Sequence, residues 1–141
     1  MTTKRPVPLE QALAQARAIA PALANATDTL NKRIVEAEDA LKDLGLGVST
    51  SITLFADEDG AGDDLCFMKW DKTWRLMVVD NDNETWEPLI NASREARLRA
   101  VQLLPLLVEK LISDAQDELK KVEEATQLAT HLTEKLKAGG L

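Results

Sequence analysis

Two heptad stripes of apolar residues, one near each end of the chain, form the clearest pattern in this sequence. Each stripe has eleven positions, ten of them apolar, whereas about five would be apolar by chance at this composition. The first, in steps of four and three, consists of Leu9, Leu13, Ala16, Ala20, Leu23, Thr27, Leu30, Ile34, Ala37, Leu41 and Leu44. The second, in steps of three and four, consists of Val101, Leu104, Val108, Leu111, Ala115, Glu118, Val122, Ala125, Ala129, Leu132 and Leu136. This spacing predicts two long amphipathic helices.

The single polar positions of the two stripes, Thr27 and Glu118, coincide when the second stripe is read backwards. In that register every facing pair of residue numbers sums to 145, beginning with Leu9 and Leu136. A polar layer inside an apolar seam is a feature that sets the register of paired helices. We therefore predict a long antiparallel helical hairpin, coiled-coil-like, with Thr27 beside Glu118.

Local signals place the two helices at about residues 8–44 and 93–137. Gly45 ends the first helix, and Ser93 is expected to cap the second. Pro21 lies inside the first helix and removes one backbone hydrogen bond. Because the heptad phase continues through Pro21 unshifted, we interpret it as a kink, with two separate helices as the alternative.

The middle third of the chain, residues 45–92, changes to the alternating, β-branched pattern that is typical of strands. Asp71 and Lys72 predict a tight turn. Strands are expected at residues 48–56, 65–70 and 73–80, with a short fourth strand at about 85–90. The predicted class is therefore α+β, with a three- to four-stranded antiparallel β-meander inserted between the two helices. At 141 residues the chain is expected to form a single domain, 1–141.

The net charge of −7 is confined to the middle third. Residues 1–44 and 93–141 together hold 14 acidic and 14 basic residues, whereas residues 45–92 hold 10 acidic and 3 basic ones. All five aromatic residues also lie in this acidic, aromatic head. In an up-and-down meander the two acidic loops fall at the same end, so their carboxylates should cluster at one pole. They belong to Asp57, Glu58, Asp59, Asp63, Asp64, Asp80, Asp82 and Glu84.

We interpret this acidic pole as a docking surface for a basic protein partner, with Trp86 as its anchor, because tryptophan is common at binding hot spots. One alternative is a solvated pole that keeps the protein soluble, with Trp86 packed under the sheet edge. Another is a cation site, but the spacing of the carboxylates does not fit an EF-hand loop, so no metal is expected. The negative charge argues against direct binding of nucleic acid, because phosphates would be repelled.

The second helix carries more apolar residues than one partner helix can cover. Leu98, Leu103, Leu107 and Ile112 lie off its stripe, and the predicted strands are apolar on both faces. We therefore expect a homodimer with these four residues at its interface. The alternative is that the sheet folds back onto the second helix.

The residue types that carry catalysis are sparse and separated. Cys66 lies in a predicted strand and His131 near the end of the second helix, which places them tens of ångströms apart. Phosphate-binding glycine motifs are absent from the sequence. We therefore expect a protein that is not an enzyme and needs no cofactor. A single cysteine, no signal-like segment and no apolar run of roughly 18 residues predict a cytoplasmic protein that does not bind membranes.

The sequence thus predicts a non-catalytic, self-associating protein-interaction module whose acidic aromatic head docks a partner. The alternative is an acidic inhibitor of the type found in phages and mobile elements. Such a protein places carboxylates where phosphates would sit and thereby blocks a nucleic-acid-binding enzyme.

Overall fold

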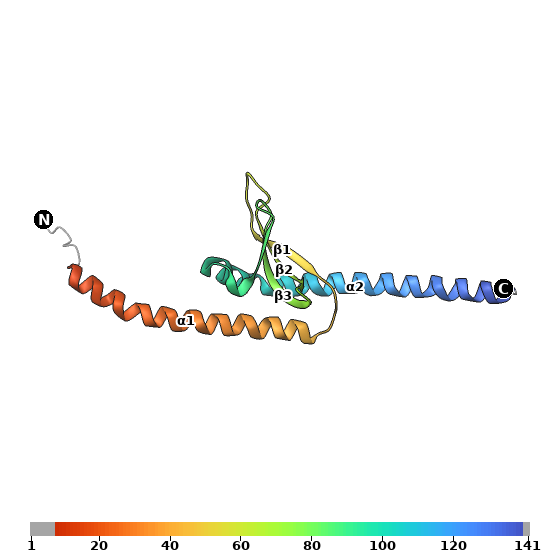
Figure 1. The fold of residues 1–141 in the computed structure, drawn as a ribbon, viewed down its shortest axis with the longest axis horizontal. Coiled ribbons are helices and arrows are strands. Elements are labelled where there is room, and N and C mark those ends of the chain that lie inside the picture. The colour runs from red at the N-terminus through yellow and green to blue at the C-terminus, as the bar shows by residue number, and fades with distance from the viewer. Residues whose placement is uncertain (1–7, 140–141) are drawn as a thin grey trace.

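Two long helices and a four-stranded antiparallel sheet make up the fold, and the computed structural model describes residues 8–139 of the chain (Figure 1). The predicted α+β class, with a β-meander inserted between two long helices, is confirmed. In chain order the elements are α1 (Leu9–Asp43), β1 (Thr50–Phe55), β2 (Asp63–Trp70), β3 (Thr73–Asp80), β4 (Thr85–Pro88), the 3₁₀ turn η1 (Leu89–Asn91) and α2 (Arg94–Ala138).

Both helices continue through an internal proline, Pro21 in α1 and Pro105 in α2. The alternative of two separate helices meeting at Pro21 is therefore wrong. The Ser93 hydroxyl accepts a hydrogen bond from the backbone N–H of Ala96 at 3.1 Å, which caps α2 as predicted. Gly45 follows α1 with a φ of 63°, in the left-handed region that a residue with a Cβ seldom adopts.

The strands are hydrogen-bonded in chain order, β1-β2-β3-β4, as a meander requires. β2 and β3 pair as far as Trp70 opposite Thr73. Asp71 and Lys72 between them have φ values of 48° and 67°, as expected for a two-residue hairpin turn. β4 is short and pairs only with residues 77–80 of β3, so within residues 8–139 the earlier part of this edge of β3 has no neighbouring strand.

The hydrophobic core lies between one face of the sheet and the inner halves of the two helices. From α1 it takes Ile34 and Leu41, and from α2 it takes Leu107 and Leu111, all of which are buried. The sheet, η1 and the start of α2 complete the core with Leu54, Leu65, Phe67, Leu76, Val78, Leu89, Ala92, Ala96 and Ala100. The helices therefore contribute to the core only near the head.

The opposite face of the sheet carries a second, smaller cluster. Cys66, Met77 and Val79 are buried there and Met68 packs against them. Trp70 and Trp86 stack with their ring centroids 6.4 Å apart and an interplanar angle of 23°. Side chains of the sheet itself thus bury Cys66, Met77 and Val79 on the face for which the sequence predicted no packing partner within the sheet.

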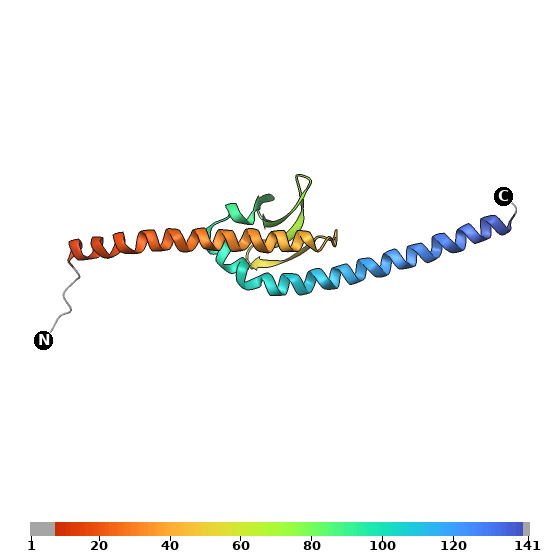
Figure 2. The same ribbon diagram turned by 90° about the horizontal axis from the view of Figure 1, so that it is seen from below.

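The two helices run in the same direction along the molecule and leave the head at opposite ends (Figures 1 and 2). α2 begins beside the middle of α1, where Arg97 donates a hydrogen bond to the side-chain carbonyl of Asn31. The antiparallel seam that the stripes predict is therefore not formed within one chain. Leu23 and Val122, which were expected to face each other, are 43% and 54% exposed.

Candidate functional site

The two helix segments that extend beyond the head expose rows of aliphatic side chains. We define the α1 arm as residues 9–30 and the α2 arm as residues 115–136, because Leu30 is the first α1 residue that packs against the core and Ala115 is the first position of the stripe beyond Leu111. Aliphatic side chains remain exposed along both arms. They are Leu9, Leu13, Ile19 and Leu23 on the α1 arm and Leu119, Val122, Leu128, Leu132 and Leu136 on the α2 arm.

The other side of the α2 arm is polar, so the arm is amphipathic. Its positions away from the apolar stripe carry Gln116, Asp117, Lys120, Glu123, Glu124, Gln127, Thr130, His131 and Glu134. An amphipathic helix in water normally packs its apolar face on another surface. Over residues 8–139, no other part of the chain covers the aliphatic side chains of either arm, which are 43% to 73% exposed.

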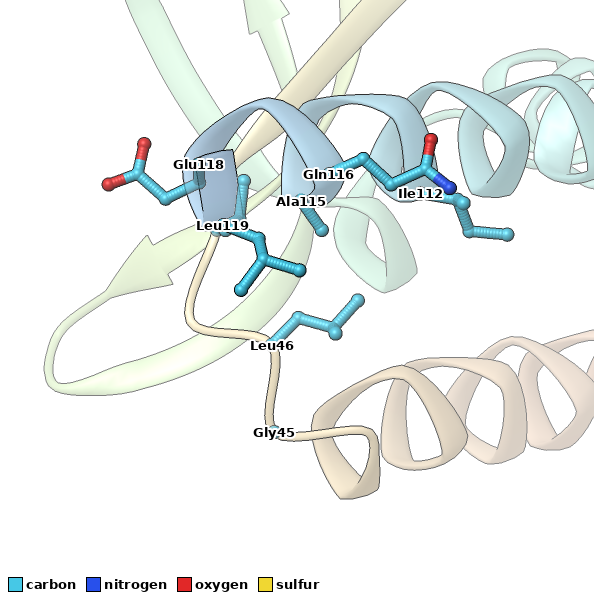
Figure 3. A pocket seen from close by; sticks show the side chains of 8 residues that line it. Gly45, Leu46, Ile112, Ala115, Gln116, Glu118 and Leu119 are labelled. Atoms are coloured by element: carbon cyan, nitrogen blue, oxygen red, sulfur yellow. The ribbon is translucent and has the colours of Figure 1, made fainter. Parts of the chain in front are cut away.

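A groove of about 470 Å³ opens at the base of the α2 arm, where the connection between α1 and β1 passes beside α2 (Figure 3). Leu46 of the connection and Leu119 of α2 point toward each other across it. Ile112 and Ala115 extend its wall along α2, and Glu118 lies at its rim. The groove is mainly apolar and is continuous with the stripe of the α2 arm, because Ala115 belongs to both.

Sequence reasoning placed Leu46 in no site. The only signal in the sequence was an apolar residue between two glycines, Gly45 and Gly47. Both glycines have a positive φ in the structure. Such a pair turns the chain sharply and can press the residue between them against a neighbouring helix. That residue is recognisable as a groove wall only when the course of α2 is known.

The acidic loops meet at one end of the sheet, as the meander predicts. Asp82 of the β3–β4 turn accepts a hydrogen bond from the backbone N–H of Ala61 at 2.8 Å, and the N–H of Asn81 donates to the carbonyl of Gly62 at 3.1 Å. Gly62 has a φ of 71°, and a Cβ there would meet the carbonyl of Phe55, so glycine is required. The structure thus brings together two loops that are about twenty residues apart in sequence.

The carboxylates of this acidic pole differ in their roles. Asp57 and Asp80 accept hydrogen bonds from backbone N–H groups of their own loops, and Asp64 accepts one from the side-chain amide of Asn81 at 3.0 Å. Among residues 8–139 no hydrogen bond uses the carboxylate of Glu58, Asp59 or Glu84. All three of these side chains are exposed. They remain available to a partner, whereas Asp57, Asp64, Asp80 and Asp82 order the loops.

Two pKa shifts follow from this arrangement. Burial, followed by the negative charges of Asp80, Asp82, Asp64 and Asp57, raises the pKa of Asp63 above its ordinary value of 3.8. Hydrogen bonds from the side chain and backbone of Asn83 lower the pKa of Asp80. The clustered charges therefore act against each other at Asp63, while the loop donors favour the charged form of Asp80.

Trp86 is 46% exposed and lies on β4, on the same face as its cross-strand partner Val79. It stacks on Trp70 instead of packing under the sheet edge. Two carboxylates of the acidic pole, Asp63 and Asp80, line one pocket together with Trp86.

The four residues expected at a dimer interface separate into two groups. Leu107 is fully buried in the core of its own chain, and Leu103 is half-buried against that core. The expectation for Leu107 is wrong because the sheet packs onto α2, which was the alternative interpretation of the sequence, whereas the expectation for Leu103 stays a prediction. Leu98 and Ile112 are 49% and 48% exposed, and Ile112 forms part of the groove.

Cys66 and His131 lie in separate parts of the molecule, the first buried in the sheet and the second exposed on the α2 arm. In the range 8–139 the side chains form no group of three metal-ligating residues. Over the same range, no helix has the length and apolar character to span a bilayer. Comparison with protein-family models, with curated proteins and with solved structures finds no match to this chain.

Proposed function

We propose that the protein is a non-catalytic, self-associating protein-interaction module whose acidic aromatic head docks a partner. The observation that carries this proposal is the row of uncovered aliphatic side chains on both arms. Apolar surface in water is unfavourable by about 25 cal/mol for each Å², and large exposed apolar patches on soluble proteins typically mark interaction sites. Association of the arms would remove this surface from water.

The docking role of the head is supported by the order within the acidic pole. Hydrogen bonds between the two loops order the backbone that carries the exposed carboxylates before a partner arrives, which lowers the entropy that binding costs. Trp86 adds a half-exposed aromatic ring, which lines a pocket together with Asp63 and Asp80 of the pole. Charge and aromatic surface together favour a basic protein partner over nucleic acid, whose phosphates would be repelled.

Sedimentation at micromolar concentration tests the self-association. A mass of 15.5 kDa, that of one chain, would contradict it, and a multiple of that mass is expected.

The docking role is tested by immobilising the protein and identifying what it retains, then repeating the capture with the Glu58→Lys, Asp59→Lys, Glu84→Lys variant. These three carboxylates take part in no described hydrogen bond, so the head should keep its fold. Glu123→Lys, Glu124→Lys, Glu134→Lys makes the same change of charge on the polar side of the α2 arm and serves as the control. Loss of the retained partner with the first variant but not with the second is expected.

A second candidate function is that of an acidic inhibitor that imitates nucleic-acid phosphates. It is favoured by one observation, the gathering of carboxylates from two loops at a single pole, where Asp63 is surrounded by four other aspartates. The two candidates differ in their response to salt. Binding through imitation of phosphates should weaken steeply between about 0.05 and 0.2 M salt, whereas docking dominated by Trp86 should change little.

A further inference from the structure

We propose that the partner of each arm is the other arm of a second copy of this chain, so that the α1 arm of one subunit lies antiparallel along the α2 arm of its partner in a closed two-fold dimer. This rests on the self-association proposed above and specifies its surface, direction and register. Within one chain the two arms project from opposite ends of the head and cannot meet (Figures 1 and 2). A second molecule is therefore needed to bring complementary arms together.

Symmetry determines the direction of the pairing. α1 and α2 run the same way along the molecule. Half a turn about an axis through the head, perpendicular to the long axis, reverses both helices of the second copy. Its α1 arm then lies at the α2 end of the first copy and runs antiparallel to it. The same operation creates the second arm pair, so the assembly closes as a dimer instead of growing into a fibre.

The register of the two stripes agrees with this arrangement at the points where the arms leave the head. In the register whose residue numbers sum to 145, Leu30 faces Ala115. Leu30 is where α1 first packs on the core, and Ala115 is the first stripe position after Leu111, the last buried residue of α2. The core boundaries of both helices therefore fall within one stripe position of the same layer. From that layer both arms extend over the same length, roughly 31 Å, to Leu9 and Leu136.

The pairing also covers the exposed aliphatic residues that lie beside the stripes. In the antiparallel register Ile19 flanks the seam opposite Leu128, and Leu119 flanks it opposite Ala24. Ile19 and Leu128 are 61% and 71% exposed in the single chain. Every large exposed aliphatic side chain of the two arms therefore belongs either to a stripe or to one of these flanking pairs.

The groove at the base of the α2 arm fits the same occupant. The partner's α1 would enter it with the segment of residues 24–31, in which Ala24 and Ala26 are small enough for a close approach between helices. Thr27 would then lie beside Glu118 at the rim of the groove, so the one polar layer of the seam falls where the groove opens to water. The opposite sides of the arms carry the polar residues and stay solvated.

Disulfide trapping between two singly substituted chains tests the register. Both chains carry Cys66→Ser, which removes the native thiol, and one carries Leu23→Cys while the other carries Val122→Cys. After the two are mixed, allowed to exchange subunits and oxidised, a disulfide-linked species of two chains is expected in the mixture and in neither chain alone. Leu23→Cys mixed with Ala129→Cys is the matched control, because a shift of one heptad, roughly 10 Å, exceeds the reach of a disulfide.

The outcomes separate this inference from the proposed function. A dimer that forms its bridge in the shifted pair, or between two Leu23→Cys chains, would overturn the arm exchange but leave self-association intact. A monomer at micromolar concentration would overturn both.

A pair of double variants tests the surface without crosslinking. Leu128→Glu with Leu132→Glu should weaken dimerisation at least about 100-fold, because four buried leucines are lost from each dimer. Thr130→Glu with His131→Glu adds the same charges on the polar side of the same arm and should leave the dimer unchanged. Equal dimerisation of the two variants would contradict the proposal, provided that circular dichroism shows equal helix content.

Discussion

Glu38 of α1 accepts a hydrogen bond from the backbone N–H of Leu76 in β3, with its Oε2 atom 2.9 Å from the nitrogen. β4 pairs with β3 only at residues 77–80, so this N–H lies just beyond the end of the last strand. A helix side chain thus takes the place of a strand at the exposed edge of the sheet. The contact joins residues 38 positions apart and attaches α1 to β3.

Glu38→Ala should lower the free energy of unfolding by about 1–3 kcal/mol, since it leaves a partly buried backbone donor without an acceptor. Urea denaturation followed by circular dichroism measures this. Glu36→Ala removes an exposed carboxylate two residues away that pairs with Arg33 and should cost less than about 1 kcal/mol. Similar losses for the two variants would show that the bond to Leu76 contributes nothing specific.

The Thr50 hydroxyl donates to Oδ2 of Asp114 at 2.7 Å, and this bond connects β1 to α2 near the groove. Thr50 is buried, so Thr50→Val keeps the shape of the side chain but removes the donor. We expect a loss of about 1 kcal/mol in the free energy of unfolding. Thr53→Val lies on the same strand with its side chain exposed and should change stability by less than about 0.5 kcal/mol.

Asp63→Asn should stabilise the protein at neutral pH. Burial, and then the neighbouring aspartates, raise the folded-state pKa of Asp63 above the ordinary value of 3.8, so the folded protein retains this proton to higher pH than the unfolded chain does. Stability is therefore lost as pH rises from 3.8 through the raised pKa. The variant should unfold at higher urea concentration than the parent at about pH 7 and at the same concentration at about pH 3.

Glu87→Gln on β4 is the control for this experiment, because it removes one negative charge from an exposed position of the same sheet. A stabilisation that is the same at both pH values, or that Glu87→Gln reproduces, would contradict the role assigned to Asp63.

The Cys66 thiol should be unreactive in the folded protein. Burial, followed by the charge of Asp64, raises the pKa of Cys66 to about 11 despite the opposing charge of Lys110. We expect labelling by a thiol reagent at about pH 8 to be at least about 100-fold slower in the folded protein than in urea. Ser113→Cys in a Cys66→Ser chain places a thiol on the exposed side of α2 and should react at nearly the same rate in both conditions.

Much of the local structure is determined by the sequence alone. Heptad spacing predicts the two helices to within a residue or two of α1 and α2, and Ser93 predicts the cap, because these signals act between residues in the same helical turn. The alternation of strand residues and the turn at Asp71 and Lys72 predict the meander. An up-and-down meander places alternate loops at the same end, so the meeting of the two acidic loops also follows from the sequence.

The relation between the two helices was decided only by the tertiary structure. The heptad periodicity of the two helices indicates that each apolar stripe packs against another surface. It does not show whether that surface belongs to the same chain. β4 is short and η1 buries Leu89 beside the core, so α2 begins next to Asn31 and not at the end of α1. Once α2 runs in the same direction as α1, its inner half can bury Leu107 and Leu111 on the sheet, and the two arms are carried to opposite ends. Packing against the sheet sets the direction of α2, and no local sequence pattern encodes that packing. The two matched stripes therefore lie apart within one chain.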